Sequence, residues 1–327
     1  MLAAIDLGTN NCRLLIGRMT GDNLNVVDSF SRIVRLGEHM AQTGRLSEPA
    51  MRRTLDALKI CADRINRHKD IRVRAVATAA CRRAANAGEL IERATAETGL
   101  QLDVVSAQEE ARLAALGCAP LVGDSYQGAL VFDIGGGSTE VIWLKRKAPQ
   151  SPAPATYSAE NPAPAALPAG KVEMVHFCSV PVGVMTLAES EHLGYAEMYA
   201  MMLEHFAAMR REMDGIGPFD VAGHHLLGTS GTVTTLAGIA LKLPRYVRSK
   251  VDGTWHDCTA MYDITQSLIG LDRPARTTIG CVGEERADLI IPGCAIYNAI
   301  QATWPCDQLR VADRGLREGI LRDLLKE

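Results

Sequence analysis

The 327-residue chain lacks several features that would assign it at once to a common class of protein. Its nine cysteines are scattered, with no CxxC pair and no histidines at zinc-ligand spacing, and the odd number argues against a complete disulfide framework. Aromatic residues make up only 5% of the chain, which gives no support to a base-stacking platform. No apolar run reaches the ~18 residues of a membrane span, and no export signal opens the chain. We expect reduced thiols, a cytoplasmic location and no membrane partner.

The charge is nearly balanced, with 35 basic and 38 acidic residues and a formal net charge of −3. Such a chain has no general attraction for nucleic acid, so any affinity for a polyanion depends on local basic clusters, such as Arg82–Arg83 and Arg245–Lys250. With 47% hydrophobic residues over this length, the chain can bury two modest cores. We therefore expect two domains and no nucleic-acid partner.

One pattern occurs twice in the chain. An apolar strand runs into Asp-x-Gly, then into polar residues with hydroxyl groups, then into a second strand, at Ala3–Gly17 (AAIDLGTNNCRLLIG) and at Leu130–Leu144 (LVFDIGGGSTEVIWL). Each turn is predicted to join the strands of a hairpin, and no GxxxxGK[ST] P-loop occurs. A single copy would be explained as an ordinary glycine hairpin. The repetition instead predicts a duplicated phosphate-binding fold with a cleft between its halves.

The two turns carry residue types that suit phosphate together with a metal ion. Glycine adopts positive φ without Cβ strain, so successive backbone N–H groups can converge on an anion, and hydroxyl groups add donors. The predicted phosphate-binding residues are Gly8, Thr9, Asn10, Asn11, Gly135, Gly136, Gly137, Ser138 and Thr139. The carboxylates of Asp6, Asp133 and Glu140 are predicted to hold Mg²⁺, directly or through water, with Mn²⁺ as an alternative because hard oxygen ligands suit both ions.

Hydrophobic periodicity predicts an α/β fold in which strands and helices alternate. The predicted strands are Asn25–Val34, Ile71–Ala77, Leu102–Val105 and Gln308–Val311, and the predicted helices are Ser47 to about Arg67, Asn86–Thr98, Ala107 to about Gly117, Thr232–Leu241 and Asp313–Leu325. We place the two domains at residues 1–124 and 125–327. The Pro/Ala-rich segment at about 146–170 is interpreted as a disordered hairpin loop inserted between two strands of the second domain.

Four further motifs follow the same order as in a known family. They are VRLGEHM at Val34–Met40, VVSAQEEARLAALG at Val104–Gly117, GTSGTVTTLAGI at Gly228–Ile239 and VADRGLREGIL at Val311–Leu321. Together with the two turns, they make nearly the whole chain resemble the exopolyphosphatase/guanosine pentaphosphate phosphohydrolase (Ppx/GppA) family, within the superfold of sugar kinases, actin and chaperone ATPases. The resemblance implies two actin-like domains related by a pseudo-twofold duplication. The chain resembles the short members of the family, which lack a C-terminal HD-like domain.

The chain departs from the family pattern at two places. Thr9-Asn10-Asn11 stands where the family usually has Ser-Asn-Ser, and Ser106-Ala107 stands where it has Ser-Gly. Both changes keep polarity or small size. They bear on substrate preference and loop flexibility more than on phosphate binding.

Two adjacent carboxylates, Glu109 and Glu110, are candidates for a catalytic base. Ser106 and Glu109 have capping-box spacing, in which the Ser106 hydroxyl accepts from the Glu109 N–H and the Glu109 carboxylate accepts from the Ser106 N–H. Glu110 has no such local partner, and a carboxylate in the first turn of a helix at a cleft can take a proton from attacking water. The family's catalytic glutamate, directly before Ala-Arg, also falls on Glu110. The alternative is a surface acid stabilised by the helix dipole.

Two other positions are candidates for anion binding. Arg82 matches a family arginine that faces the phosphate chain, although a solvated arginine beside Arg83 explains the sequence nearly as well. Ser230 and Gly231 precede a helix and could bind a third anion at its N-terminus, or could form only a tight turn with an N-cap.

Other polar residues are given structural interpretations. His224 and His225 lack spaced partner ligands and are interpreted as polar residues at a strand edge rather than as metal ligands. Asp313, Arg317 and Glu318 match the family's closing motif and are interpreted as the charge-paired start of a helix.

The resemblance implies an enzyme, a Mg²⁺-dependent phosphoanhydride hydrolase in which a glutamate activates water. It would release terminal orthophosphate processively from inorganic polyphosphate, or convert guanosine pentaphosphate (pppGpp) to ppGpp in the stringent response, and the motifs do not separate these substrates. The alternatives are a phosphotransferase of the same superfold, with acetate, a sugar or a nucleoside diphosphate as acceptor, and a non-catalytic sensor of polyphosphate or alarmone nucleotides. A homodimer is also a family expectation.

Overall fold

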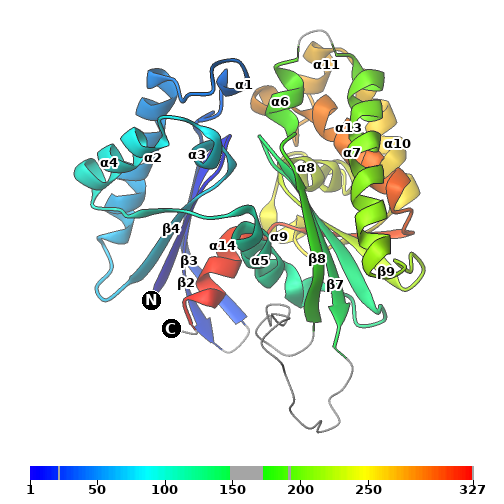
Figure 1. The fold of residues 1–327 in the computed structure, drawn as a ribbon, viewed down its shortest axis with the longest axis horizontal. Helices are drawn as coiled ribbons and strands as arrows, with labels where there is room; N and C mark the ends of the chain where they lie inside the picture. The colour runs from blue at the N-terminus through cyan, green and yellow to red at the C-terminus, as the bar shows by residue number, and fades with distance from the viewer. Residues whose placement is uncertain (21–22, 148–171, 191–192, 326–327) are drawn as a thin grey trace, which may run out of the picture.

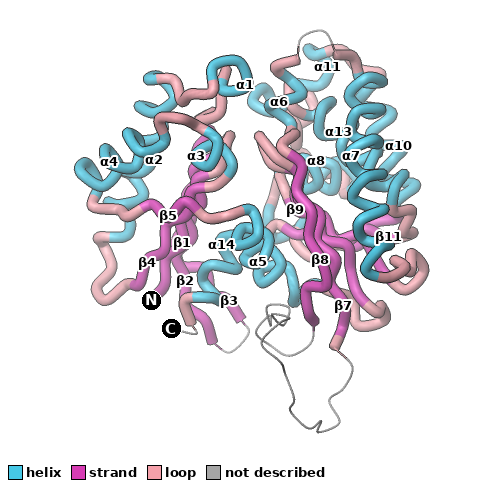
Figure 2. Tube along the Cα trace, viewed as in Figure 1, coloured by secondary structure: helices cyan, strands magenta, loops and turns pink. Residues whose placement is uncertain are grey.

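The computed structural model describes residues 1–20, 23–147, 172–190 and 193–325. It contains two α/β lobes side by side, each built on one β-sheet with helices packed against it (Figures 1 and 2). The predicted fold of two α/β domains is therefore confirmed. Nearly all of the predicted loop at about 146–170 lies outside the described residues.

The first lobe has a five-stranded sheet in the order β3-β2-β1-β4-β5. Its elements are β1 (Leu2–Leu7), β2 (Asn11–Thr20), β3 (Asn23–Ile33), α1 (Met40–Thr43), α2 (Glu48–Ile65), β4 (Arg72–Ala77), α3 (Ala79–Arg83), α4 (Ala87–Thr98) and β5 (Leu102–Val104). Strand β1 pairs antiparallel with β2 and parallel with β4. Helix α2 begins as predicted, with the Ala50 N–H donating to Ser47 Oγ at 3.3 Å.

The second lobe has a six-stranded sheet in the order β10-β11-β9-β6-β7-β8. Its elements are β6 (Gly128–Ile134), β7 (Thr139–Arg146), β8 (Val172–Val180), α6 (Val184–Ala188), α7 (Tyr195–Ile216), β9 (His224–Thr229), α8 (Gly231–Ala240), α9 (Arg248–Val251), β10 (Trp255–Asp257), α10 (Cys258–Ile269), α11 (Arg273–Thr277), α12 (Gly283–Arg286), α13 (Ile290–Thr303) and β11 (Gln308–Ala312). Strands β7 and β8 pair antiparallel, so the Pro/Ala-rich segment joins the two strands of a hairpin, as predicted.

The strand orders of the two sheets show the duplication directly. In the first lobe, β3, β2 and β1 are antiparallel neighbours, and β4 and β5 continue the sheet in parallel. In the second lobe, β8, β7 and β6 are antiparallel neighbours, and β9 and β11 continue the sheet in parallel. The short strand β10 is an addition at the edge of the second sheet. The two glycine turns therefore occupy equivalent places, β1 to β2 and β6 to β7.

Two helices, α5 (Ala107–Cys118) and α14 (Leu316–Asp323), lie against each other between the lobes (Figure 1), and the 3-10 turn η1 (Ala119–Leu121) follows α5. A Cβ added at Gly117 would lie 2.0 Å from the Gly315 oxygen, and one at Gly319 would lie 1.8 Å from the Leu113 oxygen, so this crossing needs glycine on both helices. Apolar side chains of α14 pack with those of β1. The C-terminal helix thus returns to the first lobe, whereas the predicted boundary at 124/125 divides the two sheets.

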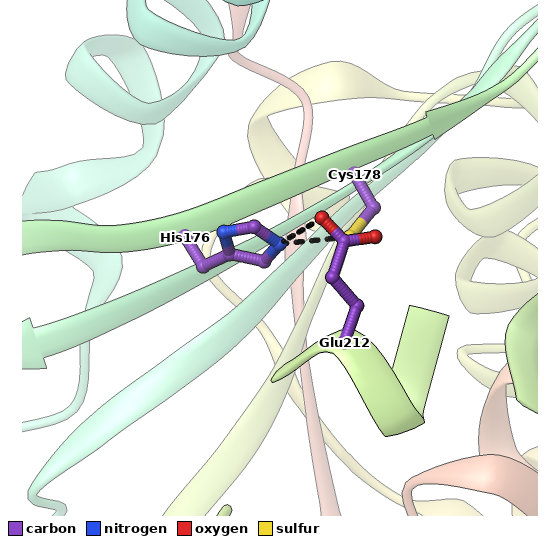
Figure 3. A group of neighbouring side chains, drawn as sticks. All are labelled: His176, Cys178 and Glu212. Atoms are coloured by element: carbon purple, nitrogen blue, oxygen red, sulfur yellow. Dashed lines mark hydrogen bonds and ion pairs between the residues drawn. The ribbon is translucent and has the colours of Figure 1, made fainter. Parts of the chain in front are cut away.

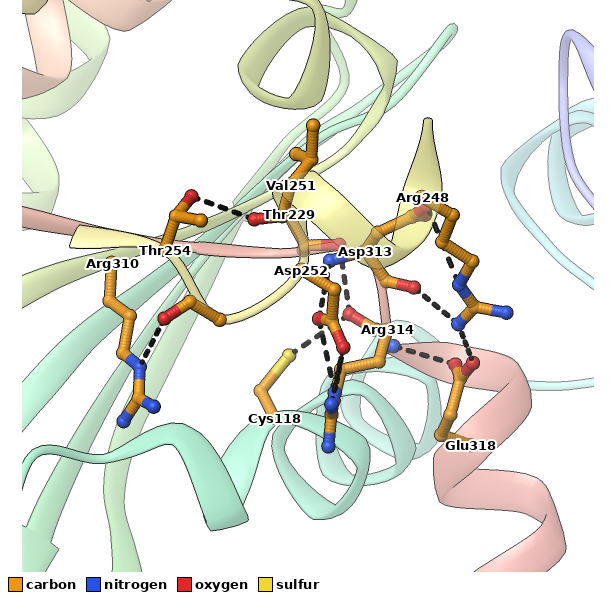
Figure 4. A network of polar contacts seen from close by, with 12 residues as sticks. Cys118, Thr229, Arg248, Val251, Asp252, Thr254, Arg310, Asp313, Arg314 and Glu318 are labelled. Atoms are coloured by element: carbon orange, nitrogen blue, oxygen red, sulfur yellow. Dashed lines mark hydrogen bonds and ion pairs between the residues drawn. The ribbon is translucent and has the colours of Figure 1, made fainter. Parts of the chain in front are cut away.

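Helix α14 begins at Leu316 and not at Asp313 as predicted. The Asp313 N–H donates to Asp252 Oδ1 at 3.0 Å, and the Arg314 carbonyl accepts from the Thr229 hydroxyl at 3.1 Å (Figure 4). These contacts hold residues 313 and 314 in a non-helical connection between β11 and the helix.

The charge pairing predicted at this helix start is confirmed for two of its three residues. Arg248 pairs with Glu318 at 2.6 Å and with Asp313 at 3.5 Å (Figure 4), and Glu318 also accepts from the Gly315 N–H at 2.9 Å. Arg317 lines, together with Asp313 and Glu318, a pocket that also reaches Asp6 and Asp133.

His224 and His225 are the first two residues of β9, but this strand lies inside the sheet between β11 and β6 and both side chains are buried. His224 Nε2 accepts from Trp143 Nε1 at 3.0 Å, and His225 Nε2 accepts from the Gly123 N–H at 3.0 Å. Burial lowers the pKa of both, to about 4 for His225. Both are neutral, hydrogen-bonded core histidines.

Each lobe has its own main hydrophobic core on one face of its sheet. A smaller cluster on the other face of each sheet includes side chains of α5 or α14. All nine cysteines are buried and unpaired, which agrees with the expected absence of a disulfide framework. In the described part of the chain, no helix is both long enough and apolar enough to cross a membrane.

Candidate active site

A cavity of about 430 Å³ lies between the two lobes, and both glycine turns line it. The predicted site residues that line it are Asp6, Gly8, Thr9, Asn10, Asn11, Glu110, Asp133, Gly135, Gly136, Gly137, Ser138, Glu140, Ser230 and Gly231. Residues far apart in the chain therefore meet in one hollow, as the duplicated pattern predicts.

The two turns close with the same backbone hydrogen bond. The Gly8 N–H donates to the Asn11 oxygen at 2.9 Å, and the Gly135 N–H donates to the Ser138 oxygen, also at 2.9 Å. In each case a strand follows directly, so both turns are hairpin turns rather than starts of helices, as predicted.

Neighbouring segments fix the orientation of the peptide groups in both turns. The carbonyls of Thr9 and Asn10 accept from backbone N–H groups of residues 34–37, and the carbonyls of Gly135 and Gly136 accept from the first two residues of α6. In a trans peptide, C=O and N–H point in opposite directions, so the N–H group that follows each of these carbonyls points away from the neighbouring segment. Turns held in this way leave backbone donors for an anion.

The glycines of the second turn are required by close packing and not, as the sequence suggested, by a positive φ. In the described part of the chain, the glycines in the left-handed region are Gly44, Gly99, Gly253 and Gly283, all outside the two turns. A Cβ at Gly137 would lie 2.9 Å from Thr9 Oγ1, and one at Gly136 would lie 3.2 Å from Asn10 Cβ. The absence of side chains at these positions lets the two turns approach each other across the cavity.

Glu110 lies in the first turn of α5 and lines the cavity. Its Oε2 accepts from Arg82 Nη1 at 2.6 Å, and the same guanidinium donates to the Val105 oxygen at 3.0 Å. Burial raises the pKa of Glu110 to about 7 although Arg82 lowers it, and the charges of Asp6 and Asp133 add to the rise. A carboxylate with a pKa near neutrality is suited to accept a proton from water.

Glu109 does not line the cavity. Its N–H donates to Ser106 Oγ at 3.1 Å, as predicted. Its carboxylate does not complete the predicted capping box, because it pairs with Arg74 at 3.0 Å and with Arg112 at 2.7 Å. The structural interpretation of Glu109 is therefore confirmed, although its carboxylate binds two arginines and not the Ser106 N–H.

Two predicted phosphate-binding residues, Arg82 and Thr139, do not line the cavity. The Arg82 side chain is only 21% exposed and reaches the cavity through its ion pair with Glu110, so the alternative of a solvated arginine is wrong. The Thr139 hydroxyl donates to the Val182 carbonyl at 2.8 Å, which removes it from the expected set of phosphate donors.

Asp6, Asp133 and Glu140 are carboxylates in the cavity wall. Burial raises the pKa of all three, to about 6 for Asp133 and about 8 for Glu140, and Arg13 partly opposes this rise for Asp6 and Asp133. An oxygen-only donor set suits Mg²⁺ or Mn²⁺, and a cation would offset the cost of burying these negative charges. Among the described residues, however, the one set of three donor atoms within 4.8 Å of one another lies elsewhere. A cation in the cavity would therefore be held partly through water.

Ser230 is the residue before helix α8, and its φ of 109° is unusual for a residue with a side chain. Its hydroxyl makes no cap hydrogen bond, and Ser230 Oγ and Asn10 Oδ1 are both buried without a partner. Unpartnered buried polar atoms are costly, so their presence in one cavity indicates a ligand. Ser230 is thus the N-cap residue of α8, as one alternative expected, but its hydroxyl does not make the cap hydrogen bond.

Sequence reasoning missed several arginines that line the cavity or the pocket beside it, among them Arg13 and Arg286, and it gave Arg317 only a structural role. Arg13 pairs in register with Asp6 across the first hairpin, and as the charged residue within an apolar strand it carried a local signal. Arg286 donates to Thr235 Oγ1 at 2.6 Å, and burial lowers its pKa and that of Arg317. Nothing near Arg286 in the sequence marks it, because only the packing of α12 brings it to α8.

The comparisons with known proteins agree with this geometry. A sequence model of the Ppx/GppA phosphatase family matches residues 15–327, and the chain belongs to this family. It is 29% identical over 339 residues to exopolyphosphatase 2 of Mycobacterium tuberculosis, with coverage of 99% of this chain and 98% of the relative. A crystal structure of the Aquifex aeolicus family member has a TM-score of 0.75 and 27% identity, covering 99% of this chain and 97% of the other. An exopolyphosphatase-like protein has a TM-score of 0.82 and 26% identity, covering 99% and 98%.

Proposed function

We propose that the chain is a phosphoanhydride hydrolase that releases terminal orthophosphate from inorganic polyphosphate, from guanosine pentaphosphate, or from both. The observation that carries the proposal is the position of Glu110, a half-buried carboxylate with a pKa of about 7 in a cavity lined by two hairpin turns of matched geometry. Membership of a phosphatase family and similarity to a protein named exopolyphosphatase 2 support it.

The residues divide the work of phosphoryl transfer, which is mainly positioning and charge neutralisation. Backbone N–H groups of the two turns bind successive phosphates, with Ser230 and the N-terminus of α8 as a third anion site. Arg13 and Arg286 supply positive charge. Asp6, Asp133 and Glu140 would hold Mg²⁺, which would neutralise charge on the phosphates. Glu110 accepts the proton of the attacking water, and Arg82 holds its carboxylate in place.

The test compares Glu110→Gln with Glu109→Gln, its neighbour in the chain. Phosphate release from long-chain polyphosphate and from guanosine pentaphosphate is measured in Mg²⁺, and substrate binding is measured by calorimetry. Glu110→Gln is expected to lower kcat by about 10²- to 10⁴-fold with binding retained, because a general base contributes about that much. Glu109→Gln is expected to stay within a few-fold of the wild type, since its carboxylate pairs with arginines outside the cavity.

Other outcomes would overturn the proposal. Tight binding without release by the wild type would indicate a sensor. Transfer of phosphate to acetate, a sugar or a nucleoside diphosphate in preference to water would indicate a phosphotransferase. The substrate from which phosphate is released faster would be the preferred one.

A further inference from the structure

Three potential metal ligands lie together on the second lobe, outside the cavity. His176 and Cys178 are two residues apart on strand β8, so they share one face of the edge of the sheet, and Glu212 approaches them from helix α7 (Figure 3). Cys178 is 7% exposed, whereas the side chains of His176 and Glu212 are 20% and 61% exposed. The cluster therefore has a buried sulfur and an opening to solvent.

The three donor atoms converge on one point. His176 Nε2 lies 3.0 Å from Glu212 Oε1 and 3.2 Å from Cys178 Sγ, and Sγ lies 3.7 Å from Glu212 Oε2. In a tetrahedral zinc site, bond lengths of about 2.0–2.3 Å separate neighbouring nitrogen, oxygen and sulfur ligands by roughly 3.3–3.6 Å. The cluster has nearly these separations without a cation.

Polar contacts already link the three side chains, since the Cys178 thiol donates to Glu212 Oε2 and His176 Nε2 lies 3.0 Å from Glu212 Oε1. Sγ also lies 3.2 Å from the same Nε2, so the three donor atoms are close enough together to bind one cation. In a catalytic Cys-His-acid triad, the acid would bind the other ring nitrogen. Burial also raises the pKa of the Cys178 thiol to about 12, so it is not a free thiolate nucleophile.

The opposite face of the same strand reaches the candidate active site. Ser179, between Cys178 and Val180, donates to Glu140 Oε1 at 3.0 Å. The residues that line the cavity and the pocket beside it do not include His176, Cys178 or Glu212. The cluster and the cavity are therefore separate sites on two faces of one strand.

We propose that His176 Nε2, Cys178 Sγ and the Glu212 carboxylate bind one zinc-class divalent cation, with water at the fourth position. Nitrogen, sulfur and oxygen donors together suit Zn²⁺ or Co²⁺ and not Mg²⁺. Binding replaces the thiol proton, which passes to solvent, by the cation. The bound ion would tie the edge strand β8 to helix α7.

The test uses Co²⁺ as a spectroscopic probe on the full chain, freed of metal by a chelator and kept in saturating Mg²⁺. We expect about one Co²⁺ per chain, a near-ultraviolet sulfur-to-cobalt charge-transfer band, and loss of the band when Zn²⁺ is added. The band distinguishes this site from the cavity, whose predicted metal ligands are all oxygens. Cys178→Ser is expected to abolish the band, and Cys306→Ser, which removes another buried thiol of the same core, is expected to keep it.

A second variant protects the test against misfolding of Cys178→Ser. Glu212 is largely exposed, so Glu212→Gln is expected to fold and to weaken Co²⁺ binding by at least about tenfold, since even the loss of an outer-shell partner of a metal costs that much. Zn²⁺ is expected to raise the Tm of the wild type by more than that of Glu212→Gln at the same concentration. A wild type without the band, or Co²⁺ affinity unchanged in Glu212→Gln, would overturn the proposal.

Discussion

The two glycine turns share a backbone and differ in the charge beside it. Each closes with a hydrogen bond of 2.9 Å from a glycine N–H, and each follows an aspartate at the same place in its sheet. Across the first hairpin Asp6 faces Arg13, whereas across the second Asp133 faces Glu140. Duplication kept the backbone geometry, while the side chains diverged so that one strand supplies a cation and the other an acid.

The proposed base, Glu110, and one proposed metal ligand, Glu140, also differ in the charge of their neighbours. Glu110 is paired with Arg82, and its pKa is about 7. Glu140 faces hydroxyl groups instead, and burial together with the charges of Glu110 and Asp133 raises its pKa to about 8. Arg82 thus keeps the Glu110 carboxylate partly ionised at neutrality, whereas a cation would be needed to do so for Glu140.

The largest expected difference between the turns is steric. A Cβ at Gly135 would lie 2.9 Å from the Ser138 carbonyl oxygen, whereas one at Gly8 has 3.6 Å to the equivalent oxygen of Asn11. Gly135→Ala is expected to lower kcat/KM for phosphate release by about 10²-fold, because a shift of about 1 Å in a catalytic site costs that much, and Gly8→Ala by less than tenfold. Steady-state kinetics of the two variants, with circular dichroism to check folding, would measure this. Equal losses would contradict the steric difference.

The pH dependence sharpens the comparison between the two acids. A base works in its ionised form, so kcat/KM is expected to rise about tenfold per pH unit below the Glu110 pKa of about 7 and to level off above it. Because Arg82 lowers this pKa, Arg82→Gln is expected to move the midpoint to higher pH. The surface variant Arg93→Gln is the control, and a midpoint that is the same in all three proteins would exclude Glu110 as the titrating base.

The second acid of the comparison, Glu140, can be tested through the pH dependence of metal binding. A cation that binds Glu140 must displace its proton, so Mn²⁺ affinity, measured by electron paramagnetic resonance, is expected to rise up to about tenfold per pH unit toward the Glu140 pKa of about 8. Glu140→Gln is expected to bind Mn²⁺ more weakly and with less dependence on pH, whereas the surface variant Glu97→Gln should behave as the wild type. An unchanged pH dependence in Glu140→Gln would remove Glu140 from the ligands.

The smallest expected effect concerns strain, which is present at Ser230 and absent from both turns. Ser230→Gly relieves the positive φ and is expected to raise the free energy of unfolding by about 1 kcal/mol, whereas Ser230→Ala keeps the strain and should give no gain. Urea denaturation would measure both. If the two variants are equally stable, the backbone at Ser230 is not strained.

Local signals predicted much of the site. The Asp-Gly turns, the capped start of α2 and the first turn of α5 depend on residues within a few positions of one another, so they could be read directly. The choice between Glu109 and Glu110 was also local, since Ser106 binds the N–H of Glu109. Arg74 and Arg112, the partners of the Glu109 carboxylate, could not be assigned, because Arg74 comes from a separate strand.

The sequence by itself determined the duplicated turns, the main strands and helices of the first lobe, and the identity of the acids that face the cleft, because each depends on periodicity or on neighbouring residues. It did not predict the long helices α7 and α13 of the second lobe. Only the tertiary structure decided that the turns pack against each other through glycines, that Thr139 faces Val182, and that Arg286 enters the cavity. These outcomes depend on contacts between segments distant in the chain. The close packing of the two lobes sets such contacts, and they cannot be predicted from the order of residues along the chain.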